Sequence, residues 1–230
     1  MDRDELKKAA AYRAIDYVES GMVVGLGTGS TAYFVVQGLG ERVAQGLDIV
    51  GIPTSERTAA QARSLNIPLT TLAEHPAIDV TIDGADEVER DTLNLIKGLG
   101  GALLREKIVA AASRQLIIVV DHEKLVDRLG AHTPVPVEIV QFGWQATAAA
   151  LQRLGAVPQL RHATEDHPFI TDGGNYILDC RFSRIADPPR LEQQIGMTVG
   201  VVESGLFIDR ASAVIVASAT GIEILTRGKA

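Results

Sequence analysis

Three groups of residues suited to chemistry on a small anionic molecule lie close together in the middle of the chain. Asp83-Gly84-Ala85-Asp86-Glu87 places acids directly after an apolar segment, and Lys97-Gly98-Leu99-Gly100-Gly101-Ala102 joins a cation to a glycine-rich turn. Glu106 follows in the first turns of a predicted helix. Carboxylates move protons, whereas a lysine and approachable backbone N–H groups bind anions. This order predicts a site at the carboxyl end of a strand, where open α/β sheets bind ligands.

A second glycine-rich turn lies upstream, at Gly25-Leu26-Gly27-Thr28-Gly29-Ser30-Thr31. It precedes a predicted helix over residues 30–44, which Ser30 or Thr31 is placed to cap. We interpret the turn as a phosphate site, because glycines let a ligand approach the backbone and hydroxyls add donors. Two alternatives stay open, a tight turn without a ligand and a dinucleotide site, since Gly27 to Ala32 fits Gly-x-Gly-x-x-Ala. The dinucleotide alternative lacks an acid at the end of the next strand, where Ile52-Pro53-Thr54 stands.

The acidic segment 83–87 also has two other interpretations, a solvated turn and a divalent metal site. A calcium loop needs more oxygen ligands at fixed spacing than this segment supplies. Lys124 follows another apolar strand, and it is either a further cation for the site or an ordinary surface lysine.

The composition is that of an ordinary globular protein with an acidic balance. The 230 residues fit one large domain or one domain that carries a smaller one. The net charge of −7 and the lack of a basic run argue against a nucleic-acid partner. Cys180 is the only cysteine, so no intrachain disulfide and no cysteine-built metal site are expected, and Cys180 is expected to be buried. No signal peptide and no apolar run of membrane-spanning length is evident, so we expect a cytoplasmic protein without a membrane partner.

Predicted strands and helices alternate through the first half of the chain. The helices are expected at 3–19, 30–44, 56–64 and 101–113, and the strands at 22–26, 48–52, 68–72, 79–82 and 115–120. This alternation is typical of an α/β fold with an open, mostly parallel, Rossmann-like sheet and helices on both faces. In the helix 101–113, Leu104, Ile108, Ala111 and Ala112 predict the buried face, so Glu106 is expected on another side, toward the cleft.

The pattern changes near residue 131. Residues 133–140 carry two prolines, which predicts an edge strand or a linker. The elements expected beyond them are helices at 143–153 and 188–195, strands at 157–160, 169–171, 176–180 and 198–203, and a turn at 172–175. Their order predicts a smaller inserted α+β subdomain that is ferredoxin-like. A strand at 213–217 returns to the first sheet, so we expect an α/β domain of 1–130 and 205–230 and a small subdomain of 131–204.

In order and spacing, these motifs resemble ribose-5-phosphate isomerases of the A type over essentially the whole chain. The segments that carry the resemblance are 25–32, 54–58, 83–87, 97–107, 134–138, 172–175 and 200–207. The resemblance implies an enzyme of the pentose phosphate pathway that interconverts ribose 5-phosphate and ribulose 5-phosphate without a metal or other cofactor. It also implies an open α/β domain with an inserted α+β domain, in a homodimer or homotetramer.

The resemblance also assigns site residues by position. Glu106 matches the family's catalytic base, and Asp83 and Lys97 complete the expected catalytic group. The substrate-binding residues are expected to be Lys7, Thr28, Gly29, Ser30, Thr31, Asp83, Gly84, Ala85, Asp86, Lys97, Gly98, Leu99, Gly100 and Lys124.

The expected chemistry is the transfer of a proton between C2 and C1 of the sugar through an ene-diolate. Glu106 would be the base, and Lys97 with N–H groups of the 98–101 turn would stabilise the negative oxygen. Asp83 and Asp86 would bind sugar hydroxyls and assist ring opening, and repulsion from them would raise the pKa of Glu106. The alternative is a non-catalytic sugar-phosphate sensor, which needs the phosphate-binding turns but no base.

Overall fold

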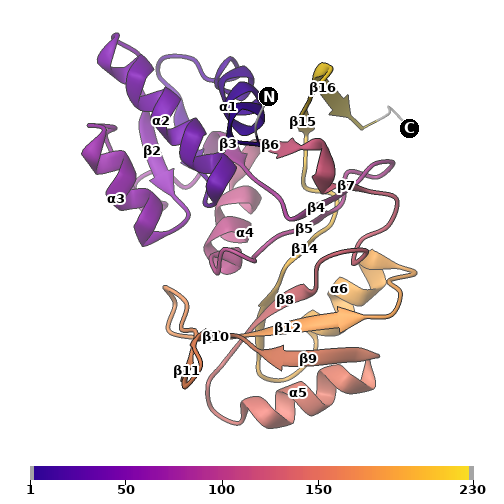
Figure 1. Cartoon of the computed structure of the whole chain (residues 1–230). Helices are drawn as coiled ribbons and strands as arrows, with labels where there is room; N and C mark the ends of the chain where they lie inside the picture. The colour runs from indigo at the N-terminus through magenta and orange to yellow at the C-terminus, as the bar shows by residue number, and fades with distance from the viewer. Residues whose placement is uncertain (1–2, 228–230) are drawn as a thin grey trace.

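A six-stranded sheet forms the centre of the larger part of the molecule in the computed structural model, which describes residues 3–227 (Figure 1). Its strand order is β16-β15-β6-β3-β1-β2, and every neighbouring pair is parallel except β15 and β16. The bounds are β1 Val23–Leu26, β2 Val50–Pro53, β3 Ile78–Asp83, β6 Ser113–Asp121, β15 Ala213–Ser218 and β16 Gly221–Thr226. The predicted mostly parallel α/β sheet is confirmed, and β16 is an antiparallel edge strand that the sequence reading missed.

Helices cover both faces of this sheet. On one face lie α1 (Arg3–Ile15) and α2 (Ser30–Ala44), with α3 (Glu56–Ser64) beside α2, and on the other lies α4 (Leu103–Ala111). In β6, Ile117 and Val119 join the core under α1 and α2, whereas Leu116, Ile118 and Val120 join the core on the opposite face. A strand buried on both faces must be apolar at every position, which explains the unbroken apolar run in β6.

A small four-stranded sheet, in the order β14-β5-β4-β7, adjoins the second face. Its strands are β4 Glu87–Glu89, β5 Leu95–Ile96, β7 Leu125–Val126 and β14 Leu206–Phe207. The sequence reading missed this sheet, because strands of two or three residues are too short to show a period.

Another four-stranded sheet, which is antiparallel and has the order β13-β8-β12-β9, forms the smaller part of the molecule (Figure 1). Its elements follow the chain as β8 Val135–Ile139, α5 Trp144–Arg153, β9 Ala156–Leu160, β12 Tyr176–Phe182, α6 Pro188–Gly196 and β13 Val201–Ser204. This strand–helix–strand–strand–helix–strand series with the first strand in the interior is the predicted ferredoxin-like arrangement. Cys180 is buried on β12, as expected.

The expectation of an edge strand or linker over 133–140 is wrong, because β8 lies between β13 and β12. Pro136 is accommodated at the end of one ladder. Its carbonyl accepts a hydrogen bond from the N–H of Gly205 (2.7 Å), just beyond the end of β13 at Ser204. In an antiparallel strand the N and O atoms of one residue point to the same neighbouring strand. The position where Pro136 lacks an N–H therefore faces the end of β13, and the pairing of β8 with β12 lacks no hydrogen-bond donor.

Three smaller expectations also need correction. The first helix ends at Ile15 rather than at 19, and the strand expected at 68–72 is a single bridge between Leu69 and Gly51. Residues 169–171 form no strand, and the hairpin of β10 (His162–Thr164) and β11 (His167–Pro168) precedes them.

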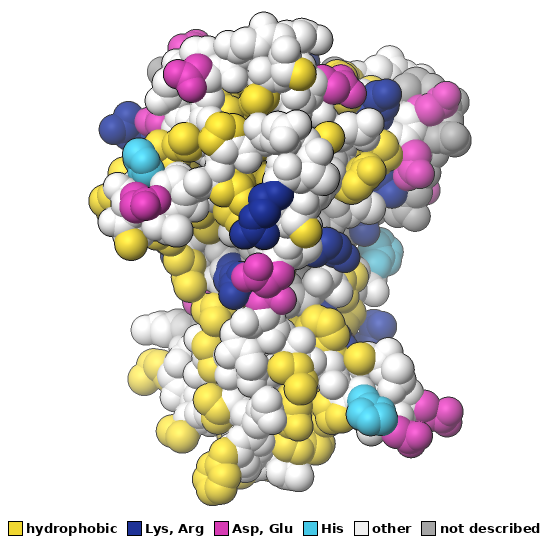
Figure 2. Space-filling model, turned by 90° about the vertical axis from the view of Figure 1, so that its left-hand side faces the viewer, with side chains coloured by type: hydrophobic (Ala, Val, Ile, Leu, Met, Phe, Trp, Pro, Cys, Tyr) yellow, Lys and Arg dark blue, Asp and Glu magenta, His cyan; other side chains and the backbone are white. Residues whose placement is uncertain are grey.

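The antiparallel sheet meets the larger part of the molecule at a waist. Figure 2 shows basic and acidic side chains beside one another at this waist. Across residues 3–227, none of the helices has the length and apolar character of a membrane span.

Candidate active site

A cavity of about 230 Å³ opens at the carboxyl ends of β1, β3 and β6. Its lining combines cations, carboxylates and glycines: Lys7, Thr28, Gly29, Ser30, Thr31, Gly84, Ala85, Asp86, Lys97, Gly98, Gly100, Glu106, Asp121 and Lys124. Among the residues predicted from the sequence, Asp83 and Leu99 do not line it. Asp121 lines it but was not predicted, although it ends β6 as Asp83 ends β3, which is the position where parallel sheets place site residues.

A buried ion triad of Asp83, Lys97 and Glu106 lies beside this cavity, and two of its members, Lys97 and Glu106, line it. The Lys97 Nζ lies 3.0 Å from Asp83 Oδ2 and 3.0 Å from Glu106 Oε1, and it also donates to the carbonyl of Gly84. Asp83, Lys97 and Glu106 are 1%, 2% and 4% exposed. Since so little water reaches these charges, each depends on the others for stabilisation.

The triad shifts the ionisation of its members. Burial, as the largest cause, and the charges of Asp83 and Asp86 together raise the pKa of the Glu106 carboxyl to about 8, against the opposing effect of Lys97. Burial by itself would lower the pKa of Lys97, but Asp83 and Glu106 raise it above its ordinary value. Glu106 is therefore a basic carboxylate beside a permanently charged lysine, and it lies at the wall of an open cavity.

The buried face of α4 differs from the one expected. It carries Leu103, Glu106, Lys107 and Val109, whereas Ile108 is 48% exposed. The expected face was wrong because α4 is packed between two sheets, contacting β3 and β6 on one side and β8 and β13 on the other. Its two buried charges have partners: Glu106 meets Lys97, and Lys107 meets two glutamates of α6 and β13.

Asp83, at the end of β3, holds the first glycine-rich turn through hydrogen bonds. Its Oδ1 accepts hydrogen bonds from the N–H of Thr28 (3.0 Å) and of Gly84 (2.7 Å), and its Oδ2 faces Lys97. A side chain on Gly27 would place its Cβ 2.3 Å from Asp83 Oδ1, so only glycine fits there. Both carboxylate oxygens of Asp83 are thus directed at the protein.

The N-terminus of α2 faces the cavity without a side-chain cap. The expected cap at Ser30 or Thr31 is wrong, because the capping position is Gly29, with φ of 125° and no capping side chain. Ser30 and Thr31 begin the helix and line the cavity, so N–H groups of the first turn lack intrahelical acceptors. Such an end attracts anions through its N–H groups and the helix dipole.

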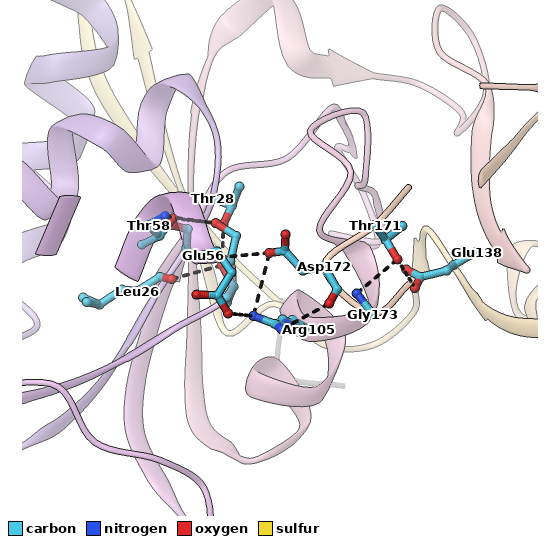
Figure 3. A network of polar contacts seen from close by, with 12 residues as sticks. Leu26, Thr28, Glu56, Thr58, Arg105, Glu138, Thr171, Asp172 and Gly173 are labelled. Carbon is cyan, nitrogen blue, oxygen red and sulfur yellow. Dashed lines mark hydrogen bonds and ion pairs between the residues drawn. The ribbon is translucent and has the colours of Figure 1, made fainter. Parts of the chain in front are cut away.

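The hydroxyl of Thr28 belongs to a buried cluster at the start of α3. It lies 2.7 Å from the Thr54 hydroxyl, 2.8 Å from that of Ser55 and 3.1 Å from that of Thr58. Ser55 caps α3 by accepting the N–H of Thr58 (Figure 3 labels Thr28 and Thr58). This cluster fixes the turn from the side opposite the cavity.

The second glycine-rich turn is joined to the acidic segment. The N–H of Leu99 donates to Asp86 Oδ2 at 2.9 Å, and the N–H of Asp86 donates to the carbonyl of Ile96. Burial raises the pKa of Asp86, against the lowering effect of the Leu99 N–H and of nearby cations. Gly98 and Gly101 have φ of 112° and 80°, which other residues rarely adopt.

Two lysines provide positive charge at the rim. Lys7 of α1 is paired with Asp4 at 3.1 Å, and Lys124 follows β6 in a short 3-10 turn, η1 (His122–Lys124). Within the described part of the chain, Lys124 forms no ion pair shorter than 4.0 Å. It therefore has charge available for an anionic ligand.

A polar network fastens the antiparallel sheet to the larger part (Figure 3). Arg105 lies 2.8 Å from Glu56 and 3.7 Å from Asp172, and Asp172 accepts the N–H of Glu56 at 2.9 Å. On the other side of the same loop, the Thr171 hydroxyl donates to the buried Glu138 at 2.9 Å. The turn predicted at 172–175 thus connects the starts of α3 and α4 to β8.

Within residues 3–227, no group of three or more His, Cys, Asp or Glu side chains is arranged to hold a metal ion. The expected lack of a metal cofactor stays a prediction.

Comparison with known proteins places this arrangement in a family. Residues 50–221 match the family model of ribose 5-phosphate isomerase A (phosphoriboisomerase A). The chain is 65% identical to ribose-5-phosphate isomerase A of Gloeobacter violaceus, over 98% of each chain. A solved D-ribose-5-phosphate isomerase in complex with phospho-erythronic acid is 43% identical over 99% of this chain and 100% of that one, with a TM-score of 0.96. The enzyme of Plasmodium falciparum is 42% identical over 98% of this chain and 100% of its own, with a TM-score of 0.93. The chain belongs to the ribose 5-phosphate isomerase A family.

Proposed function

We propose that this chain interconverts ribose 5-phosphate and ribulose 5-phosphate with Glu106 as the base. Membership of the family makes the chain an aldose–ketose isomerase. The observation that supports the base is the position of Glu106, a buried carboxylate of raised pKa at the wall of the cavity. Such a group is basic enough to take a proton from carbon next to a carbonyl.

The substrate phosphate is assigned to the rim of the cavity at the N-terminus of α2. The open N–H groups and hydroxyls of Ser30 and Thr31 would hold it, together with Lys124 and Lys7. A relative solved with phospho-erythronic acid supports a phosphorylated ligand, because that molecule joins a phosphate to a carboxylate. An ene-diolate of ribose 5-phosphate carries negative charge at the same two ends.

The isomerisation then follows in two proton transfers at carbon and one between the two oxygens. Glu106 takes the C2 proton of the open-chain aldose, and the C–H electron pair forms the C1–C2 double bond as the C1 carbonyl oxygen becomes negative. The C2 hydroxyl passes its proton to the negative C1 oxygen, and the C2 oxygen then forms the C2 carbonyl. At the same time the electron pair of the C1–C2 double bond takes the proton back from the carboxyl of Glu106 and forms the new C1–H bond. The charge of Lys97 and the N–H groups of Gly98 and Gly100, which line the cavity, are assigned to the charged oxygen. The N–H groups of Leu99 and Gly101 are not assigned to it, since they already donate to Asp86 and to the Gly98 carbonyl.

Different roles are proposed for the two aspartates. Asp86 lines the cavity and is assigned to the sugar hydroxyls and to opening of the furanose ring. Asp83 is directed at Thr28, Gly84 and Lys97, so its part in catalysis is to hold Lys97 and the first turn. Substrate contact by Asp83 would need one of these bonds to break.

A non-catalytic sensor is disfavoured. A sensor would need the phosphate-binding turns but not the buried glutamate and lysine, and the family that the chain joins is one of isomerases. A homodimer or homotetramer in the cytoplasm remains part of the proposal.

The direct test is to mix the purified protein with ribose 5-phosphate and measure ribulose 5-phosphate by NMR. Rapid conversion, with none for unphosphorylated ribose, is expected. If the protein binds ribose 5-phosphate but does not convert it, the proposal is wrong and the sensor is favoured.

A further inference from the structure

Arg161 reaches from the antiparallel sheet to the back of the catalytic turn. It follows β9, and its Nη1 donates to the carbonyl of Gly98 at 2.8 Å and to that of Leu99 at 3.1 Å. These carbonyls belong to the turn whose other side lines the cavity through Gly98 and Gly100. The guanidinium therefore touches the turn without lining the cavity.

Asp179 of β12 holds this guanidinium in place. Arg161 Nε lies 2.9 Å from Asp179 Oδ2, and Nη2 lies 2.5 Å from Oδ1, which is a bidentate pair. The arginine and aspartate side chains are 13% and 23% exposed, so water screens the pair little. The backbone is fixed as well, because the N–H of Arg161 donates to the carbonyl of Ile177 at 2.9 Å.

Phe169 completes the support. Its ring lies 5.9 Å from the guanidinium carbon of Arg161, and its N–H donates to the Arg161 carbonyl. The same ring covers Gly101, where a Cβ would come within 2.4 Å of it. The outer surface of the turn is thus packed against two side chains, that of Arg161 after β9 and that of Phe169 after β11.

The inner surface of the turn faces Asp86 and the cavity. The Leu99 N–H donates to Asp86 Oδ2 at 2.9 Å, and it belongs to the same segment whose carbonyls accept hydrogen bonds from Arg161. Because Gly98, Gly100 and Gly101 give the backbone of the turn wide conformational freedom, contacts on both sides are needed to keep it in one conformation.

We propose that Arg161, clamped by Asp179, is a positioning residue that holds the 98–101 turn in its catalytic conformation. This inference rests on the proposed function, and it adds a contribution of the antiparallel sheet to the chemistry. Only a guanidinium suits the position. Two of its nitrogens donate to the carboxylate of Asp179, and its third nitrogen donates to the carbonyls of Gly98 and Leu99. A lysine has no such fork.

The test compares Arg161→Met, Arg161→Lys and Asp179→Asn with Arg181→Met. Arg181 is an exposed arginine on the same strand as Asp179, so its variant controls for the loss of charge. A shift of about 1 Å in a positioned group costs on the order of 10²-fold in rate. We expect kcat to fall at least about tenfold in both Arg161 variants, less in Asp179→Asn, and to stay unchanged in Arg181→Met. The KM is expected to change less than kcat, because the phosphate contacts lie at α2.

Hydrogen exchange of single amides gives a readout that is independent of activity. In the Arg161 variants, the Leu99 amide should lose protection, whereas the Thr28 amide, bound to Asp83, should keep it. Unchanged kcat per folded molecule together with an unchanged Leu99 amide would overturn the inference. If Arg161→Met does not fold, Asp179→Asn and Arg161→Lys carry the same two readouts. If the wild type shows no isomerisation, the proposed function fails, and the Leu99 amide still decides whether Arg161 holds the turn.

Discussion

The two glycine-rich turns resemble each other in sequence but are supported from different parts of the molecule. The first, at 27–31, is held within the larger part, by Asp83 below and by the hydroxyls of Thr54, Ser55 and Thr58 behind. The second, at 98–101, is held from the antiparallel sheet by Arg161 and by Phe169. Similar glycine patterns thus meet two tasks: the first presents a helix N-terminus for an anion, and the second lies beside the proton-transferring groups.

We therefore assign substrate binding mainly to the first turn and proton transfer mainly to the second. Changes on the side of the second turn should act mainly on kcat, and changes on the side of the first turn mainly on the binding of the phosphate.

The largest effect is expected for Glu106→Gln, which keeps the shape and removes the base. We expect kcat to fall by about 10²–10⁴-fold, with little change in KM, as is usual when a general base is lost. Steady-state kinetics with ribose 5-phosphate measures this, with the exposed Glu165→Gln as the matched control. Activity above a tenth of the wild-type value would rule out Glu106 as the base.

Lys97→Met should damage both catalysis and folding. Loss of an oxyanion-stabilising group typically lowers kcat by about 10²–10³-fold. The variant also leaves Asp83 and Glu106 buried without a cation, which costs about 3–5 kcal/mol in the free energy of unfolding. Because protonation removes the buried charge of Glu106, whose pKa is already raised by burial, the deficit should grow as the pH rises. Urea titration at two pH values, beside the exposed Lys8→Met, measures it, and a deficit independent of pH would contradict the ion triad.

The pH profile should show the raised pKa of Glu106. A base acts when deprotonated, so kcat/KM should fall about tenfold for each pH unit below about 8, far above the ordinary range of a glutamate. Asp86→Asn removes one of the charges that raise this pKa. The acid limb of the kcat/KM profile, where the rate falls, should therefore move to lower pH. An acid limb near pH 4–5, or one unmoved in Asp86→Asn, would contradict the assignment.

The smallest effect is expected on the side of the first turn. Lys124→Ala should raise the KM for ribose 5-phosphate and the inhibition constant of inorganic phosphate by about 10- to 150-fold, which corresponds to the ~1.5–3 kcal/mol of one hydrogen bond to a charged group. The kcat should change little. Lys8→Ala, on an exposed part of α1, is the control. An unchanged KM, or a loss confined to kcat, would remove Lys124 from the phosphate site.

Much of the large sheet and most of the cavity could be predicted from the sequence, because the signals are local. The apolar strands end directly in the turns and acids that line the cavity, and Lys97 to Glu106 lie within one short segment. Asp121 also ends a strand and lines the cavity, but it was not predicted because no glycine-rich turn follows it. The division into 1–130 with 205–230 and 131–204 stays a prediction; β8, β9, β12 and β13 of the antiparallel sheet all lie within 131–204.

The features that could not be predicted depend on contacts between distant segments. The buried face of α4 follows from two sheets that close on it, and Pro136 fits an interior strand only because β13 ends beside it. The support of the second turn is of the same kind, since Arg161 lies about 60 positions beyond the turn that it touches.

The most direct test of the central claim, that Glu106 moves the proton between C2 and C1, is hydrogen exchange with solvent. Ribose 5-phosphate is incubated in D₂O with the wild type or with Glu106→Gln, and deuterium at C1 of ribulose 5-phosphate and C2 of ribose 5-phosphate is followed by NMR. Deuterium is expected at these carbons with the wild type, and essentially none over the same time with Glu106→Gln. Exchange in Glu106→Gln at a rate within tenfold of the wild type would show that another group removes the proton.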